Sequence, residues 1–417
     1  MGKTVFTNAH DLLAALARIM NIINPAVESH HERVAYLSFQ MATELGMCNR
    51  EGLQCVVAAL LHDVGALFAE EQPQDLSFEL HAHHLAAAGA EMMEDLPYFD
   101  EVARIVASCQ RPWRLRRPVG SDPEEAPLIS SIVRLADHAS ICIGESAALN
   151  QREEILALFA KRDRDEYAPE VADAFQRVCE RDAVWMDLVY DPHVLLDLIA
   201  PIPLSLDRTS ELCCLVSRLI DYRSSFTAMH SAGVSASAVR LAELVGMSDD
   251  ECQMMEIAGF LHDLGKLRTP KAILEAPRRL TDQEFNIIKE HAYFTHQILS
   301  RIEGFESICE WASLHHERLD GGGYPFRLSG RQLPLGARIM AVADIFSAVT
   351  EERPYRKGMD RERTIAVMRD NVERGALSPR IVELLLDNFD DVNERRDIAS
   401  RIEGARYFQA LERSRTA

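Results

Sequence analysis

The chain repeats itself at an offset of 200 residues. His30 aligns with His230, and Leu61-His62-Asp63 aligns with Leu261-His262-Asp263, with no gap over that stretch. Repeats of solenoid proteins are only about 20 to 50 residues long. A period this long corresponds to a whole domain instead. The repeat therefore predicts two copies of one domain, each of about 200 residues and with the same fold.

The boundary between the copies is expected near Pro201-Ile202-Pro203, because two prolines interrupt the helical pattern there. This places a first domain at residues 1–200 and a second at residues 201–417. Most of both copies reads as helix, since apolar residues recur at spacings of three and four. One example is the group Leu12, Leu13, Leu16, Ile19 and Met20. Alternating β-branched runs are absent, so the predicted fold class is all-α, with two tandem helical domains.

Composition limits the partners and the compartment. The formal net charge is −20, which argues against a DNA or RNA polymer as partner, because such proteins need a basic face. No run of eighteen apolar residues predicts a membrane span, and the N-terminus does not resemble a signal peptide. The nine cysteines show no paired spacing, as expected for reduced thiols in a cytoplasmic protein. Tandem helical domains often dimerise, so a homodimer is an alternative to a monomer.

The second copy carries a set of histidine and aspartate residues on or beside predicted helices: His230, His262, Asp263, His291, His315, His316 and Asp344. A single helical histidine is usually a surface or core residue. The adjacent pair His262-Asp263, however, ends an apolar helix, where unpartnered polar groups would cost several kcal/mol. Imidazole and carboxylate ligands suit first-row transition metals. Seven ligands suffice for two ions that share Asp263, and paired metals are typical of phosphoryl transfer.

These residues lie within motifs that resemble a known family. Residues 262–266 read His-Asp-Leu-Gly-Lys, similar to the signature of the HD phosphohydrolases. Residues 315–325 read His-His-Glu-Arg-Leu-Asp-Gly-Gly-Gly-Tyr-Pro, similar to the extension that defines the HD-GYP type, and the resemblance runs from about residue 205 to 390. It implies a phosphodiesterase that hydrolyses a cyclic dinucleotide, mostly cyclic di-GMP in this family, to a linear dinucleotide or mononucleotides.

The resemblance also implies roles for individual residues. His230, His262, Asp263 and Asp344 would hold one metal, and Asp263, His291, His315 and His316 the second. Asp263 and Lys266 would act in catalysis, Lys266 by contacting the scissile phosphate. Tyr324, Arg353 and Arg356 would bind the other phosphate and the bases. The cofactors would be two divalent transition-metal ions: iron, manganese, nickel or zinc.

Two positions depart from the family pattern. Phe226 stands where some members carry a glutamate that supports a third metal, so two metals are expected. Ser347 stands where an aspartate often lies near the substrate pocket, which leaves the base preference open. The tandem layout is also similar to HD-GYP proteins that prefer 3′3′-cyclic GMP-AMP. Cyclic di-GMP and 3′3′-cyclic GMP-AMP therefore remain alternative substrates.

The first copy keeps a smaller set, His30, His62, Asp63 and Asp137, which is a possible vestigial one-metal site. Ala66 replaces the lysine, and Cys109-Gln110 or its neighbours replace the histidine pair. We therefore expect a degenerate HD-like domain that acts as a scaffold or regulator. The alternative for the whole chain is a catalytically weak sensor of cyclic dinucleotides that signals through protein contacts. A third option, a general nucleotide phosphohydrolase, does not explain the Gly-Tyr-Pro segment.

Overall fold

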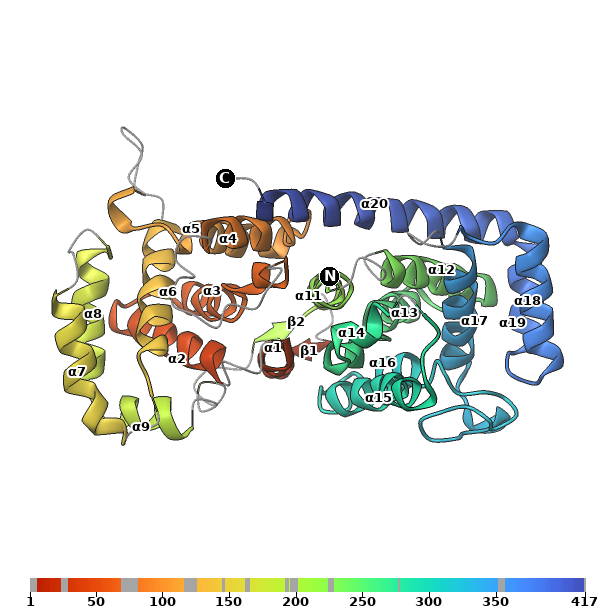
Figure 1. Cartoon of the computed structure of the whole chain (residues 1–417), viewed down its shortest axis with the longest axis horizontal. Helices are drawn as coiled ribbons and strands as arrows, with labels where there is room; N and C mark the ends of the chain where they lie inside the picture. The colour runs from red at the N-terminus through yellow and green to blue at the C-terminus, as the bar shows by residue number, and fades with distance from the viewer. Residues whose placement is uncertain are drawn as a thin grey trace. The chain divides into compact units, whose positions relative to one another are not determined.

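The computed structural model describes residues 6–23, 29–68, 82–115, 126–144, 147–161, 166–191, 195, 202–223, 229–276, 278–351 and 357–415. Helices account for nearly all the regular structure in these ranges, and the strands are two segments of two residues each. The predicted all-α fold with two tandem HD-type domains is confirmed. Figure 1 shows the helices in chain order.

By contacts, the described chain forms two compact units. One contains the residues up to Ala15 together with Ile202–Phe408, and the other contains Leu16–Pro201 together with Gln409–Ala417. Helices α1 (Ala9–Ile23) and α20 (Phe389–Arg415) each contribute residues to both units. The assignment of a degenerate domain to residues 1–200 and a catalytic domain to 201–417 stays a prediction. The compact units differ from that division at both ends of the chain.

The unit that contains the second copy is a helical bundle around α12 and α13. Its elements are α11 (Leu206–Asp221), α12 (His230–Val245), α13 (Asp249–Leu261), the 3-10 helix η7 (Leu264–Arg268), α14 (Lys271–Leu274), α15 (Asp282–Leu299), α16 (Glu306–Ser313), the 3-10 helix η8 (Gly330–Gln332), α17 (Leu335–Thr350), α18 (Arg361–Glu373) and α19 (Pro379–Asp387). Helix α12 packs against α13 and α17, and α13 also packs against α11 and α16 (Figure 1).

Local sequence signals set where these helices begin and end. Ser248 precedes α13 and accepts a hydrogen bond from the backbone N–H of Glu251, whose carboxylate in turn accepts from the N–H of Ser248. Thr281 and Glu284 form the same reciprocal cap at the start of α15. Such capping boxes satisfy backbone donors that the first turn leaves free. Gly246 ends α12 with a φ of 86°, a conformation that glycine adopts without steric cost.

A short strand pair ties the N-terminus to the second copy. Strand β1 (Thr7–Asn8) pairs antiparallel with β2 (Pro203–Leu204), with Thr7 opposite Leu204. The Thr7 hydroxyl donates to the carbonyl oxygen of Glu303 at 2.9 Å. The Phe6 ring lies 5.9 Å from that of Phe305. These contacts explain why residues 6–15 cluster with residues 202–408.

The unit that contains the first copy repeats the same helix order. Its described elements are α2 (His30–Glu44), α3 (Asn49–Leu61), the 3-10 helix η2 (Val64–Phe68), α4 (Ala82–Glu91), η4 (Pro97–Phe99), α5 (Asp100–Cys109), η5 (Trp113–Leu115), α6 (Ala126–Ile141), α7 (Ala148–Lys161), α8 (Pro169–Cys179) and α9 (Asp182–Tyr190). Helix α2 packs against α3 and α6, as α12 packs against α13 and α17. The duplication is therefore one of structure as well as of sequence.

One described segment is long and apolar enough to cross a membrane by composition alone. It spans Asn49–Phe68, and 61% of its most apolar window is buried inside the protein. Burial of this extent is typical of a helix in a protein core. The segment also carries His62 and Asp63, two of the predicted ligands of the first copy. All nine cysteines are free thiols, and the cytoplasmic location remains a prediction.

Candidate metal centre

The fold brings the seven predicted ligands of the second copy together from five helices. His230 begins α12, His262 and Asp263 follow the end of α13, and His291 lies in α15. His315 and His316 follow α16, and Asp344 lies in α17. Six of the seven residues are buried, whereas the His316 side chain is 28% exposed. The centre is thus closed on the protein side and accessible beside His316.

Three of the imidazoles are oriented by their own helices. In each, Nδ1 hydrogen-bonds to the carbonyl oxygen three residues earlier, which leaves Nε2 to point into the centre. The pairs are His262 with Gly259 at 2.8 Å, His291 with Ile288 at 2.6 Å, and His315 with Ala312 at 2.6 Å. A hydrogen bond of this kind fixes the tautomer of a metal-binding histidine. The backbone therefore presets which nitrogen is available.

Asp263 lies between two groups of these histidines. Its Oδ2 is 3.2 Å from Nε2 of His262, and its Oδ1 is 3.4 Å from Nε2 of His291. Nε2 of His291 is in turn 3.4 Å from Nε2 of His315. The carboxylate thus has one oxygen on each side of the centre, which is the arrangement of a bridging ligand.

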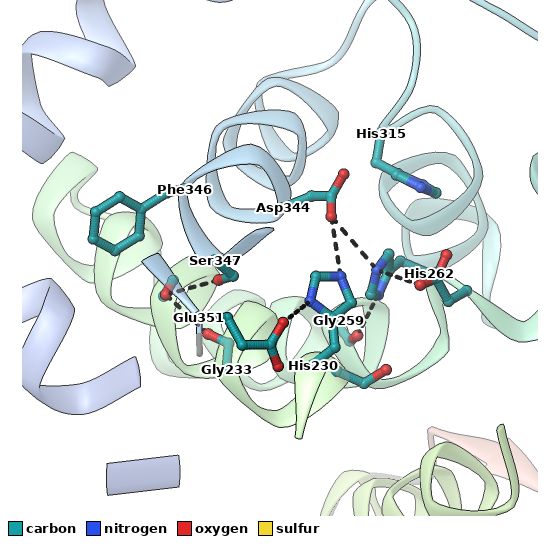
Figure 2. Close-up of polar contacts among 12 residues, drawn as sticks. His230, Gly233, Gly259, His262, His315, Asp344, Phe346, Ser347 and Glu351 are labelled. Carbon is teal, nitrogen blue, oxygen red and sulfur yellow. Dashed lines mark hydrogen bonds and ion pairs between the residues drawn. The ribbon is translucent and has the colours of Figure 1, made fainter. Parts of the chain in front are cut away.

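His230 is held between two carboxylates (Figure 2). Its Nε2 lies 3.2 Å from Oδ1 of Asp344, and its Nδ1 lies 3.4 Å from Oε2 of Glu351. Burial lowers the pKa of His230, but the bonds to Asp344 and Glu351 outweigh this effect and raise it to about 10. The same Oδ1 of Asp344 is 4.0 Å from Nε2 of His262. Asp344 therefore approaches both His230 and His262 with the same oxygen.

The donor set fits divalent metal ions. Ligand atoms lie within 4.8 Å of one another in three groups: His230, His262 and Asp344; His262, Asp263 and His315; and His291, His315 and His316. Among the described residues, Nε2 of His262 and Oδ1 of Asp263 are buried and have no hydrogen-bond partner. Buried polar atoms without partners are costly. Ions within these groups would remove that cost.

Protonation favours metal binding at four of the seven predicted ligands, whereas His230, with its raised pKa, must release a proton to bind an ion. Burial lowers the pKa of His291 to about 3 and that of His316 to about 4, and it holds the pKa of His315 well below its ordinary value. Burial alone would raise the pKa of Asp263, but His262 and Lys266 hold it well below the usual range. Neutral imidazoles and an ionised carboxylate are the forms that bind metals.

Lys266 and the Gly-Tyr-Pro loop border this centre. The Nζ atom of Lys266 lies 2.5 Å from Oδ2 of Asp263. The Tyr324 ring stacks on His316, with ring centroids 4.8 Å apart and planes 36° apart. Glu317 shapes the loop by accepting hydrogen bonds from the backbone N–H groups of Phe326 at 2.6 Å and Leu328 at 3.0 Å. A predicted cation and a predicted aromatic contact residue thus adjoin the ligand cluster.

Three predicted positions fall outside the described residues. These are the substrate contacts Arg353 and Arg356, and Phe226, which stands where a third metal would need a glutamate. Ser347 is buried, and its hydroxyl lies 3.5 Å from that of Ser237.

Two residues that contact the predicted centre or its loop were missed by sequence reasoning. Glu351 contacts His230, and it follows Asp344 by seven residues, directly after the last residue of α17. That spacing is the signal that could have identified it. Glu317 lies directly after the histidine pair, and its role was hidden because its partners are backbone groups rather than side chains.

The first copy assembles a similar but smaller cluster. Nε2 of His30 lies 3.3 Å from Oδ1 of Asp137, and Nε2 of His62 lies 3.2 Å from Oδ2 of Asp63. Nδ1 of His62 bonds to the carbonyl oxygen of Ala59 at 2.7 Å, as Nδ1 of His262 bonds to that of Gly259. His30, His62 and Asp63 offer ligand atoms within 4.8 Å. The four predicted residues are therefore in place for one ion.

Among the described residues of the first copy, the counterpart of the second copy's histidine pair is occupied differently. At the position of His316, Gln110 uses its backbone and side-chain oxygens to accept hydrogen bonds from Arg134 at 2.7 and 3.3 Å. Arg134 is buried and also pairs with Glu166. The Arg134 guanidinium thus lies beside the counterpart of the His315-His316 pair. A positively charged group does not bind a metal ion, so this position is unsuited to a second ion.

Both copies match a known family. Residues 27–141 and 214–381 each match the family described as HD domain. The chain is 25% identical to 3′3′-cGAMP-specific phosphodiesterase 1 of Vibrio cholerae over 405 residues, covering 91% of this chain and 92% of that protein. It is 31% identical to 3′3′-cGAMP-specific phosphodiesterase 3 of the same organism over 291 residues, covering 68% of this chain and 62% of that protein.

Shorter and structural similarities agree. The cyclic di-GMP phosphodiesterase response regulator RpfG of Xanthomonas campestris is 37% identical over 183 residues, covering 43% of this chain and 48% of that protein. A crystal structure of the V. cholerae cyclic GMP-AMP phosphodiesterase V-cGAP3 superposes with a TM-score of 0.59 and 22% identity, covering 92% of this chain and 98% of that one. This last similarity is one of fold. The chain therefore belongs to the HD domain family, as a tandem of two HD domains whose second member is of the HD-GYP type.

Proposed function

We propose that the second HD domain hydrolyses a phosphodiester bond of a cyclic dinucleotide in second-messenger signalling. The observation that carries this proposal is the cluster around Asp263, whose two oxygens face His262 and His291 while Lys266 pairs with the same carboxylate. The names of the similar proteins, which are phosphodiesterases for 3′3′-cGAMP and for cyclic di-GMP, support the same reaction.

In this proposal, the centre holds two divalent transition-metal ions. His230, His262, Asp263 and Asp344 would hold one ion, and Asp263, His291, His315 and His316 the other. When bound, the ions would supply positive charge that polarises the phosphate and activates water. Iron, manganese, nickel and zinc all suit mixed histidine and carboxylate ligands.

The chain's own residues would position the substrate. Lys266 carries its ammonium at the edge of the centre, where it would neutralise charge that develops on the scissile phosphate. Burial raises the pKa of the Tyr324 phenol, so this group stays protonated and can donate a hydrogen bond to a phosphate oxygen. Arg353 and Arg356 remain predicted substrate contacts, because guanidinium groups bind phosphate in a paired geometry.

Of the two candidate substrates, 3′3′-cyclic GMP-AMP is the first choice. The relative that this chain matches over 92% of its length, across both copies, is named for that nucleotide. RpfG, named for cyclic di-GMP, is matched over 48% of its length. The tandem arrangement therefore favours the mixed dinucleotide, and cyclic di-GMP remains the alternative.

A direct assay tests the reaction and the substrate together. The protein is loaded with manganese or with iron, incubated separately with each cyclic dinucleotide, and the linear product is followed by chromatography. We expect cleavage of 3′3′-cyclic GMP-AMP at a higher kcat/KM than that of cyclic di-GMP. If both nucleotides bind tightly and neither is cleaved, the chain is a sensor rather than an enzyme.

For the first HD domain, we propose one metal ion held by His30, His62, Asp63 and Asp137, with a structural or regulatory role. Ala66 stands in place of the lysine, and Arg134 lies beside Gln110, which replaces a ligand of the second ion. The first domain would thus lack both the lysine and the second ion that the second domain is proposed to use for diester cleavage. Metal analysis of a variant that lacks the second centre would measure this ion directly.

A further inference from the structure

An aromatic surface lies beside the metal centre, on the outer side of helix α15. Phe285, Lys289 and Tyr293 are spaced four residues apart, which places them along one face of the helix. His291, a predicted ligand, points into the centre from another face. Phe285 and Tyr293 are 47% and 43% exposed. Two large rings thus stand in solvent next to the reacting centre.

Lys289 connects this surface to the centre. Its Nζ lies 5.2 Å from the centroid of the Phe285 ring and 6.0 Å from that of Tyr324. Tyr324 in turn packs against His316, a predicted metal ligand. Among the residues that the structure describes, no carboxylate forms an ion pair with Lys289. In a protein of net charge −20, this ammonium group beside the predicted ligand cluster is therefore available to an anionic group of a ligand.

The surface continues into the Gly-Tyr-Pro loop. Phe326, which is 40% exposed, lies with its ring 6.5 Å from that of Tyr293 and 5.0 Å from that of His296. The backbone N–H of Phe326 is fixed by Glu317, so this ring is held by the same loop that carries Tyr324. Exposed apolar side chains that gather in one patch are typical of an interaction or ligand surface.

We propose that Phe285, Lys289, Tyr293 and Phe326 form a second nucleotide subsite, hereafter the α15 subsite. This inference rests on the proposed function. A cyclic dinucleotide has two phosphates and two bases, and the metal centre engages only one phosphate. Lys289, whose Nζ lies 6.0 Å from the Tyr324 ring, would add a further cation to the predicted contacts Tyr324, Arg353 and Arg356 at the remaining phosphate. The base attached to that phosphate would stack on the rings of the subsite. Such stacking accepts any purine, so the α15 subsite sets affinity for a dinucleotide rather than the choice of base.

The test compares a cyclic dinucleotide with a small diester that has no second nucleotide. Lys289→Met removes the charge but keeps the apolar stem, and Phe285→Leu removes the ring. Each variant is assayed with 3′3′-cyclic GMP-AMP, with cyclic di-GMP and with bis(4-nitrophenyl) phosphate. Arg301→Met is the matched control, because it removes one positive charge from an exposed position that lies beyond the end of the same helix.

We expect the ratio of kcat/KM for a cyclic dinucleotide to kcat/KM for the small diester to fall about 10-fold in Lys289→Met. The fall should come from KM, and Arg301→Met should keep the wild-type ratio. Equal losses for both substrates would show that Lys289 supports the metal centre instead. An unchanged ratio would show that the second nucleotide lies elsewhere. Either result overturns the α15 subsite.

A binding measurement separates this inference from the proposed function. Asp263→Asn is used as a background without turnover, and binding of a fluorescent cyclic dinucleotide is followed with and without Lys289→Met. If the wild-type protein cleaves nothing but Lys289→Met weakens binding about 10-fold, the subsite stands and the enzyme proposal fails. If the wild-type protein cleaves the nucleotide and binding is unaffected by Lys289→Met, the subsite alone fails.

Discussion

The substitution Gly265→Ala tests whether the centre depends on close approach of two backbones. Gly265 follows Asp263 by two residues, and its N–H donates to the hydroxyl of Thr295 at 3.0 Å. A Cβ atom at this position would lie 2.0 Å from the carbonyl oxygen of His291 and 2.7 Å from its Cα. Real Cβ contacts essentially never fall below 3.0 Å. The first of these distances must therefore increase by at least 1.0 Å.

The opposing atoms belong to the backbone of a predicted ligand, so no side-chain rotation relieves the clash. Overpacking of this kind costs about 1–3 kcal/mol of folding free energy. Metal–ligand distances tolerate only about 0.2 Å, and misplacement by about 1 Å can lower turnover about 100-fold. We therefore expect Gly265→Ala to lose the ion held by His291 and to lower kcat/KM about 100-fold.

The assay combines metal content by mass spectrometry, kcat/KM and denaturant unfolding. Gly246→Ala is the control, because a Cβ there meets nothing within 4 Å, although its φ of +86° is strained for alanine. We expect this control to cost about 1–2 kcal/mol of stability while it retains its metal ions. If Gly265→Ala keeps both ions and the wild-type kcat/KM, the reasoning from backbone approach is wrong.

Three further predictions concern the two centres. Asp263→Ala should abolish turnover and remove bound metal, whereas Asp63→Ala should leave turnover largely intact; loss of turnover in a folded Asp63→Ala protein would contradict the scaffold role of the first copy. Glu351→Gln should weaken metal binding about 10–100-fold, because the carboxylate orients His230, and metal titration would measure this; unchanged affinity would remove Glu351 from the centre. The metal-free protein should lose stability as the pH falls from about 6.5 towards 3. In that range the unfolded state binds a proton at His291 that the folded state, with its lowered pKa, does not. Denaturant unfolding at several pH values checks this, and His291→Gln should reduce the dependence, with His315 and His316 accounting for what remains.

Much of the centre could be predicted because its ligands are carried by short motifs at helix ends. His262 and Asp263 are adjacent, and the histidine pair precedes the Gly-Tyr-Pro segment, so local sequence already groups them. The repeat gave the same result for His62 and Asp63. The helical fold followed from apolar spacing alone. Caps such as Ser248, whose side chain accepts from a backbone N–H three residues later, explain where the helices begin.

The remaining features depend on contacts between distant segments. Glu351 lies 121 residues after His230, and only the packing of α17 on α12 brings them to 3.4 Å. Arg134 reaches Gln110 in the same way, from one helix to the end of another. The pairing of Thr7 with Leu204 joins segments almost 200 residues apart. Two-residue strands carry no periodic signal, so a sequence pattern cannot indicate them.

The strand pair formed by β1 and β2 has a consequence for experiments that separate the two copies. A truncated protein beginning at residue 202 would lack Thr7 and Asn8, and β2 would become an unpaired edge. The Phe305 ring would also lose its contact with Phe6. Unpaired edges recruit strands from other chains, so such a fragment is prone to self-association and exchange of N-terminal segments. Inactivity of that fragment would report a missing strand, and a regulatory effect of the first copy is better tested by substitutions in the intact chain.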